Sequence, residues 1–268
     1  MITRGLICGA LAATLFASFS GHESSVFAAD VPSASREQPL ASPMPPQLSL
    51  HAAAYLWATG LDGKLRTLPP LPAANISIGF DQVIQNLDGS LMGAAELKYG
   101  RILLFMDLIA SKISPNKTVY PAGYPAGIEI DSSSFIGLAA AGYRLVDDPG
   151  YSIDALAGIR GFVMKNTLRV QLMPTPLKLS DSEQWVDGVV GLRLKVNLPS
   201  SFYATTIGFL GKGASRYEWD VFGGLGYDFN DRFSAFAGYR AMKVDYRNGN
   251  FIYNALQQGP VLGLITHF

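Results

Sequence analysis

The chain contains one cysteine among its 268 residues, Cys8, and three histidines, of which only His51 and His267 lie beyond residue 28. If the first residues are removed on export, the remaining chain has no thiol, so neither a disulfide nor a cysteine-ligated metal is expected. Histidine-dependent catalysis also needs a serine, aspartate or glutamate partner for proton transfer. Neither histidine has such a partner at a recognisable spacing, so we expect no catalytic residue, no metal site, no cofactor and no enzyme activity.

The chain also lacks an excess of charge and long apolar runs. Its 21 basic residues balance 21 acidic ones, so no basic stripe is available to displace counterions from nucleic acid, which excludes nucleic acid as a partner. Beyond residue 28 no run of eighteen uninterrupted apolar residues occurs, and membrane-spanning helices are thereby excluded. The 49% apolar content must be accommodated in another way.

The first 47 residues divide into two segments that precede the expected fold. Residues 1–28 combine Arg4, an apolar run over 6–19 and small residues around Ala28, which predicts a secretory signal peptide. Residues 29–47 are rich in proline, serine and alanine and offer too little apolar surface to offset the entropy of the chain. We expect them to form a flexible lead-in to one domain over residues 48–268.

Residues 48–268 alternate between apolar and polar positions in about ten extended segments. These segments are 48–61, 90–99, 101–111, 128–145, 151–165, 183–196, 202–211, 216–229, 232–246 and 251–268. The joints carry the Gly, Pro, Asn and Asp typical of turns. Short joints alternate with longer ones over 62–89, 112–127 and 166–182, and this alternation predicts an antiparallel up-and-down sheet with long loops at one end. Eight strands remain the alternative.

Within these segments the charged residues fall on one face and the bulky apolar residues on the other, as a strand period of two requires. The charged positions assigned to an inward face are Glu96, Lys98, Asp107, Arg144, Asp154, Arg160, Asp187, Arg193, Asp220 and Arg240. Ten strands enclose too little space for a core of the apolar faces, so we expect the charges inside a barrel and the apolar side chains outside. Asp220 is expected to lie across from Arg240, through a three-residue turn over 229–231.

Aromatic residues gather at the two ends of the segments and predict two outward girdles at the level of lipid headgroups. The short-turn girdle comprises Tyr99, Tyr143, Tyr151, Phe202, Tyr227, Phe229, Phe233 and Phe268. The long-loop girdle comprises Trp57, Phe162, Trp185, Tyr217, Trp219, Tyr246, Phe251 and Tyr253. In the first long loop, apolar residues at helical spacing over 80–87 predict a short helix, placed either in the mouth or on the rim.

The last segment, GPVLGLITHF, is an alternating strand that ends on Phe268. In this respect the sequence resembles Gram-negative outer-membrane β-barrel proteins of the small OmpA/OmpX-like or porin-like kind. The resemblance implies that the C-terminal strand, with Phe268 as its signal, is recognised by the barrel-assembly machinery. It also implies a place in the outer membrane among lipid and lipopolysaccharide, with both termini periplasmic.

Two functions of different classes are compatible with this interpretation. In the first, the protein is a non-enzymatic barrel with a structural or surface-interaction role, its polar lumen largely plugged by paired charges. In the alternative, it is a narrow porin-like channel for small solutes or ions. About ten strands enclose little free space, and this favours the first function. Nothing in the sequence specifies a ligand for the loops.

Overall fold

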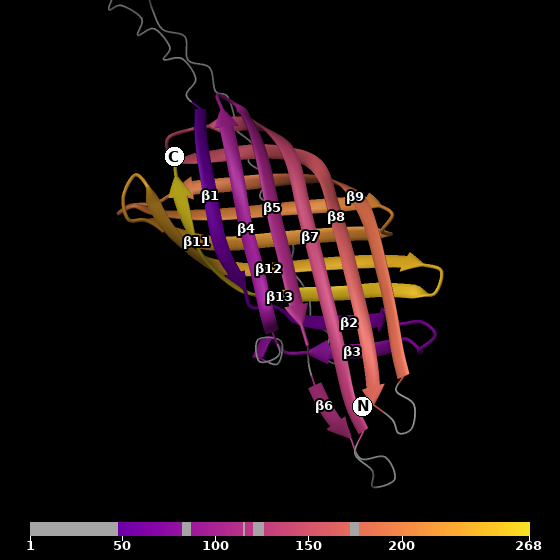
Figure 1. The fold of residues 1–268 in the computed structure, drawn as a ribbon. Helices are drawn as coiled ribbons and strands as arrows, with labels where there is room; N and C mark the ends of the chain where they lie inside the picture. The colour runs from indigo at the N-terminus through magenta and orange to yellow at the C-terminus, as the bar shows by residue number, and fades with distance from the viewer. Residues whose placement is uncertain (1–47, 82–86, 115, 120–125, 172–176) are drawn as a thin grey trace, which may run out of the picture. The chain divides into compact units, whose positions relative to one another are not determined.

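Ten antiparallel strands close into a β-barrel (Figure 1). The computed structural model describes residues 48–81, 87–114, 116–119, 126–171 and 177–268. In spatial order the ten strands are β1 (Leu48–Trp57), β4 (Leu87–Tyr99), β5 (Ile102–Ile113), β7 (Ala126–Asp147), β8 (Tyr151–Gln171), β9 (Leu177–Asn197), β10 (Phe202–Gly213), β11 (Tyr217–Asp228), β12 (Phe233–Asn248) and β13 (Phe251–His267). The predicted ten-stranded up-and-down barrel is confirmed, and the eight-stranded alternative is not observed. The predicted signal peptide and lead-in lie outside the described residues.

The first and last strands close the barrel by pairing with each other. β1 is antiparallel to β13 from His51 opposite His267 to Trp57 opposite Val261. On its other edge, β1 pairs with β4 from Leu48 to Ala54. Because β1 has a partner on both edges, this part of the wall leaves no strand edge available for aggregation.

Three further strands lie at the long-loop end: β2 (Gly60–Arg66), β3 (Ala74–Ile78) and β6 (Asn116–Val119). β2 pairs with β13 in the register of β1, with Gly60 opposite Gln258. The first strand of the barrel is therefore interrupted only at residues 58 and 59. β2 pairs on its other edge with β3, whereas the described pairing of β1 with β4 ends at Gly93.

The long loops predicted over 62–89, 112–127 and 166–182 are shorter than expected because strands occupy most of them. β7, β8 and β9 are 22, 21 and 21 residues long, and β8 stays paired with β9 as far as Val170. Continued backbone pairing satisfies the N–H and C=O groups along the full length of these strands. Of the helix predicted over 80–87, Phe80 and Asp81 are helical and Leu87 begins β4; the residues between them lie outside the described ranges.

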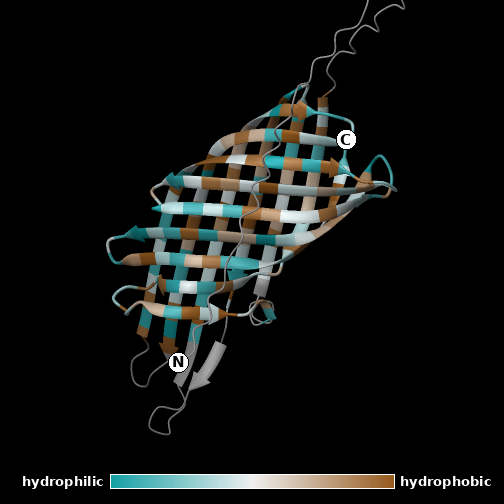
Figure 2. Cartoon of the chain, turned by 180° about the vertical axis from the view of Figure 1, so that it is seen from behind, coloured by the Kyte–Doolittle hydropathy of each residue, from teal (hydrophilic) through white to brown (hydrophobic). Residues whose placement is uncertain are grey.

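Hydrophobic and hydrophilic residues alternate along the strands (Figure 2). Large apolar side chains are exposed on the outer surface of the ten strands. This apolar outer band comprises Leu56, Leu91, Leu97, Leu104, Met106, Leu108, Phe135, Ile159, Val163, Val186, Val190, Leu192, Leu210, Val221, Leu225, Tyr239, Leu262 and Leu264, each at least 37% exposed. Such a continuous band is typical of strands that face lipid. Among the described residues no helix is long and apolar enough to span a membrane.

The two predicted aromatic girdles have different outcomes. At the short-turn end Tyr99, Tyr143, Tyr151, Phe202, Tyr227, Phe229, Phe233 and Phe268 are all exposed. At the long-loop end only Tyr217 is exposed and Trp219 half-buried. The other six residues of that girdle, Trp57, Phe162, Trp185, Tyr246, Phe251 and Tyr253, are at most 6% exposed. Their assignment to the lipid face is wrong, because they point into the barrel.

Candidate functional site: a layered lumen

The long-loop half of the lumen is filled by the six buried aromatic residues just named, which we call the aromatic plug. The Trp185 ring is the centre of a stack, 4.0 Å from the Tyr246 ring at an interplanar angle of 4° and 4.8 Å from the Phe162 ring at 12°. Phe251 and Tyr253 pack around Trp185 at ring distances of 6.5 and 6.0 Å. Met92, Ile109, Ile136, Met164, Met242 and Val244 belong to the same apolar cluster. Buried aromatic and apolar side chains therefore fill the lumen at this level.

A layer of buried charges, the middle ion group, lies directly against the plug. Arg240 donates from Nε to Asp220 Oδ1 at 2.9 Å and from Nη2 to Asp107 Oδ2 at 2.7 Å. Arg160 Nη2 donates to Asp220 Oδ2 at 2.7 Å. The Arg240 guanidinium carbon lies 5.1 Å from the Trp57 ring centre. Ion pairs and plug are thus in contact, which fits the preference of guanidinium groups for aromatic faces.

Two further buried carboxylates belong to the middle ion group but are less fully paired. Glu218 Oε2 lies 3.7 Å from Arg160 Nη1, and no hydrogen bond to either of its carboxylate oxygens is found among the described residues. Asp187 Oδ1 accepts a hydrogen bond from the Ser215 backbone N–H at 2.7 Å. Buried polar groups with few partners are costly, so this layer depends on its two arginines remaining in place.

A second ion group lies nearer the short turns and is centred on Asp154. We call it the lower ion group. Arg144 Nε donates to Asp154 Oδ1 at 2.7 Å, and Arg193 Nη2 donates to Asp154 Oδ2 at 2.7 Å. Arg193 also pairs with Glu96 on the far side of the lumen. Because Asp154 is fully buried and bridges two arginines, this group links β4, β7, β8 and β9 across the interior.

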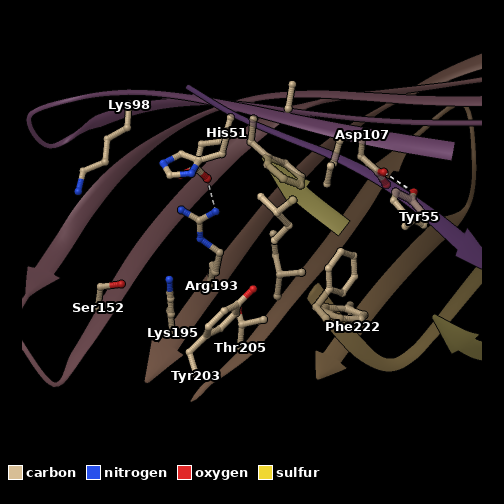
Figure 3. A pocket seen from close by; sticks show the side chains of 18 of the residues that line it. His51, Tyr55, Lys98, Asp107, Ser152, Arg193, Lys195, Tyr203, Thr205 and Phe222 are labelled. Carbon is tan, nitrogen blue, oxygen red and sulfur yellow. Dashed lines mark hydrogen bonds and ion pairs between the residues drawn. The ribbon is translucent and has the colours of Figure 1, made fainter. Parts of the chain in front are cut away.

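Between the middle ion group and the short turns, the lumen opens into a chamber of about 460 Å³. Its walls combine apolar side chains, among them Phe105, Phe222 and Phe236, with the charged residues of both ion groups. Lys98 reaches into the chamber from β4 and Lys195 from β9, next to Arg193 (Figure 3). Lys195 Nζ lies 4.3 Å from the Tyr203 ring centre. The lining includes turn-end residues but no member of the aromatic plug, so the chamber is blind toward the long-loop end.

The two histidines meet at the rim of this chamber, where the barrel closes. His51 Nδ1 lies 2.5 Å from His267 Nδ1, as their opposed register positions require. His267 Nε2 lies 2.6 Å from Ser234 Oγ, and Ser234 Oγ donates to Asp228 Oδ1 at 2.6 Å. A serine hydroxyl has one proton, and here Asp228 accepts it. The Ser234 oxygen therefore accepts from His267, which is the reverse of the bond that activates a nucleophile.

All ten charged residues predicted for the lumen have inward positions, but in three different surroundings. Asp107, Arg160, Asp187, Asp220 and Arg240 form the middle ion group, and Glu96, Arg144, Asp154 and Arg193 form the lower one. Lys98 lines the chamber, and no ion pair of Lys98 is found in the described part of the chain. Phe268, the predicted assembly signal, exchanges backbone hydrogen bonds with Leu50.

The sequence did not lead us to predict Glu218, Tyr55 or the aromatic plug as lumen residues. The signal for the plug was the strand period: Trp185 is two residues from Asp187 and Phe162 two residues from Arg160, so each pair shares a face. Tyr55 donates its hydroxyl to Asp107 at 2.5 Å and accepts from Arg240 at 3.1 Å. Within the described ranges no group of three His, Cys, Asp or Glu residues is placed to hold a metal ion.

Comparisons with known proteins give similarity of fold without close relationship. No family model and no curated protein matches the sequence. Among solved structures, the outer membrane protease OmpT of Escherichia coli aligns with 83% of this chain and 97% of its own, at 8% identity and a TM-score of 0.48. The translocator domain of autotransporter NalP of Neisseria meningitidis covers 82% and 88% at 12% identity and 0.42. Ail, the attachment invasion locus protein of Yersinia pestis, covers 84% and 100% at 11% identity and 0.35.

These similarities are too distant to transfer a role, and the assignment of the fold comes from the chain itself. Its strands close into a ring through His51 and His267, its outer surface carries an apolar band, and the charged side chains at the level of that band, among them Asp107, Arg160 and Arg240, are turned inward. This combination is the pattern of barrels that lie in lipid. The chain is a closed antiparallel β-barrel with this pattern of faces.

Proposed function

We propose that this protein is a non-enzymatic, non-conducting outer-membrane barrel with a structural or surface-interaction role. The observation that supports this proposal is the sequence of layers across the lumen: a stacked aromatic plug, then buried ion pairs, then a chamber that is blind at its inner end. An ion crossing the barrel would have to displace Trp185 and the rings of Tyr246 and Phe162 that stack on it. Catalysis finds no support at the histidine pair, since Ser234 donates to Asp228.

The second candidate is a narrow channel, and the chamber favours it. About 460 Å³ of open lumen lies in the short-turn half of the barrel, so the plug, the middle ion group and the Arg193–Glu96 pair are the barriers between the two sides. A rearrangement of the long-loop half would be required for conduction. The β2–β3 hairpin is the part of the described wall with least support on the β4 side.

Single-channel recording in a planar bilayer tests the proposal. The native protein is expected to give no conductance steps above background, because the plug excludes water. A Phe162→Ala/Trp185→Ala variant removes two stacked rings and is expected to give steps of small amplitude. A Trp219→Ala variant, whose half-buried ring lies on the opposite face of its strand from Glu218 and Asp220, is the matched control and is expected to remain silent. Regular steps from the native protein would favour the channel.

A further inference from the structure

A further group of charges lies on the outside of the barrel, beyond the apolar outer band at the long-loop end. Its basic members are Lys112, Lys165, Arg169 and Lys178, which surround Ser133, Thr167, Ser180 and Asp131. Together these residues line a shallow cavity of about 270 Å³. We call this set the basic outer cluster. It is separate from the lumen, since no residue of the chamber belongs to it.

Strand register fixes the arrangement of the cluster on β5, β7, β8 and β9. Ser133 lies between its register partners Lys112 and Lys165. One row closer to the long-loop end, Thr167 lies between Asp131 and Ser180. In the row after that, Arg169 lies opposite Lys178. Hydroxyl groups therefore occupy the centre of the cluster and basic side chains its edges. Paired strands hold these positions, so the site is built on the rigid wall and not on a loop.

The charges of the cluster are unequal. Four basic residues face the two acids Asp131 and Glu129, which leaves two positive charges. Both acids are engaged by the same partner: Arg169 pairs with Asp131 and lies 3.3 Å from Glu129. No ion pair of Lys165 or of Lys178 is found among the residues that the structure describes. These two lysines flank the hydroxyl groups with their positive charge uncompensated.

The height of the cluster on the barrel identifies the environment that it meets. On β5 the outward residues change from Leu108 to Lys112 within four residues, and on β8 from Val163 to Lys165 within two. Leu108 and Val163 are both more than 40% exposed. On β7 the outward residue next to Phe135 is Ser133. Since the apolar band meets hydrocarbon, the cluster lies at the level of the lipid headgroups.

We propose that the basic outer cluster binds the phosphate-bearing headgroup of a membrane lipid, a phosphorylated glycolipid of the leaflet at the long-loop end. Phosphate oxygens accept hydrogen bonds from ammonium, guanidinium and hydroxyl groups, all of which the cluster supplies. Lys165 and Lys178 contribute the charge, and the exposed Ser133 and Ser180 contribute donors between them. The buried Thr167 hydroxyl lies 3.1 Å from Ser180 Oγ and holds that side chain in place. The acyl chains of the same lipid lie along Phe135, Val163 and Val186 of the apolar band.

The test uses the full chain folded in a neutral detergent and native mass spectrometry to count bound lipid during a titration. The probe is lipid A with two phosphates, compared with its fully dephosphorylated form. Bis-phosphorylated lipid A is expected to bind one copy per barrel and the dephosphorylated form at least tenfold more weakly. Lys165→Gln/Lys178→Gln is expected to weaken binding about 30-fold, at roughly fivefold for each charge lost near a lipid surface.

Lys212→Gln is the matched control. Lys212 is an exposed lysine on the outer face of β10, two residues beyond Leu210 of the apolar band, and its replacement is expected to leave binding within twofold. Asp131→Asn is expected to strengthen binding, because it releases Arg169 and removes a negative charge from the centre.

Three results would overturn the proposal: unchanged binding by the double lysine variant, equal losses on replacing Lys212, or equal binding of the dephosphorylated lipid. Inorganic phosphate is added in a separate arm, and displacement of lipid A by millimolar phosphate would show a site for free phosphate and not for lipid. Lipid binding and conductance are independent measurements. A conducting barrel would contradict the proposed function and leave this site intact.

Discussion

Arg240 and Asp220 are joined by two hydrogen bonds although they are not opposite each other in the sheet. Arg240 Nε lies 2.9 Å from Asp220 Oδ1 and Nη2 lies 2.7 Å from Oδ2. The register places Arg240 opposite Phe222 and Asp220 opposite Met242, so the pair is diagonal. The expected three-residue turn is wrong: β11 ends at Asp228 and β12 begins at Phe233, which leaves four residues between them. A two-residue displacement keeps both side chains on the inner face.

Replacing Arg240 by Met is expected to lower the free energy of unfolding by about 3–5 kcal/mol, because Asp107 and Asp220 then lose a buried partner. Unfolding in urea from lipid vesicles, followed by tryptophan fluorescence, measures this change. Arg247→Met is the control. Arg247 pairs with Asp245 at 3.2 Å but is 39% exposed, and exposed pairs contribute at most about 1 kcal/mol. Equal losses from both substitutions would show that the buried network does not stabilise the barrel.

Replacing Trp185 by Ala is expected to destabilise the barrel by roughly 3–5 kcal/mol, because a large ring leaves a cavity among Phe162, Tyr246 and Tyr253. The same urea titration, followed by the heat-modifiable mobility of the folded barrel on gels, checks it without relying on tryptophan fluorescence. Trp219→Ala removes the same side chain from the outer face, where lipid can fill the space. Trp219→Ala is therefore expected to lower the free energy of unfolding less than Trp185→Ala does. The difference between the two variants measures the contribution of packing in the plug.

The strand period makes the two faces of each segment predictable from the sequence. It does not predict which residues lie at which level along the barrel axis. The alternation correctly turned Arg160, Asp187 and Asp220 inward. The same alternation places Phe162 and Trp185 inward, whereas their position near strand ends matches an outward girdle, so the two sequence patterns conflict at these residues. Position along the barrel axis depends on where the apolar outer band ends, and the sequence alone did not show that β8 and β9 extend well beyond it.

Contacts between strands distant in sequence were the least predictable part of the site. The closure of the barrel brings His51 to His267, and this proximity follows from any ring of strands. The bond from Ser234 to Asp228, or the reach of Arg193 across the lumen to Glu96, depends on register and on side-chain conformation. A shift of two residues in any pairing would change these partners while leaving the alternation intact.

The carboxyl of Asp131 provides a prediction about pH outside the apolar band. A hydrogen bond from Ser114 and then the pairing with Arg169 hold the pKa of Asp131 below its ordinary value of 3.8. A group with a lowered pKa in the folded state stabilises that state above the ordinary pKa and loses this contribution as the pH falls through the lowered value. Ser114→Ala is therefore expected to raise the pKa of Asp131, measured from its carboxyl carbon shift in an NMR titration.

Gly259 is expected to be intolerant of any side chain, because the interruption of the first strand brings another backbone against it. A β-carbon at this position would lie 1.8 Å from the carbonyl oxygen of Ala58, and the Ala58 N–H donates to the Pro260 carbonyl at 2.9 Å. Neither backbone can move without loosening the pairing of β13 with both β1 and β2. Gly259→Ala should therefore destabilise the barrel by about 1–3 kcal/mol, the range for overpacking, and speed amide exchange along β2. Gly161→Ala is the matched control, since a β-carbon there meets no atom within 4 Å. If both variants unfolded at the same urea concentration as the native protein, the close approach at the interruption would not constrain closure of the barrel.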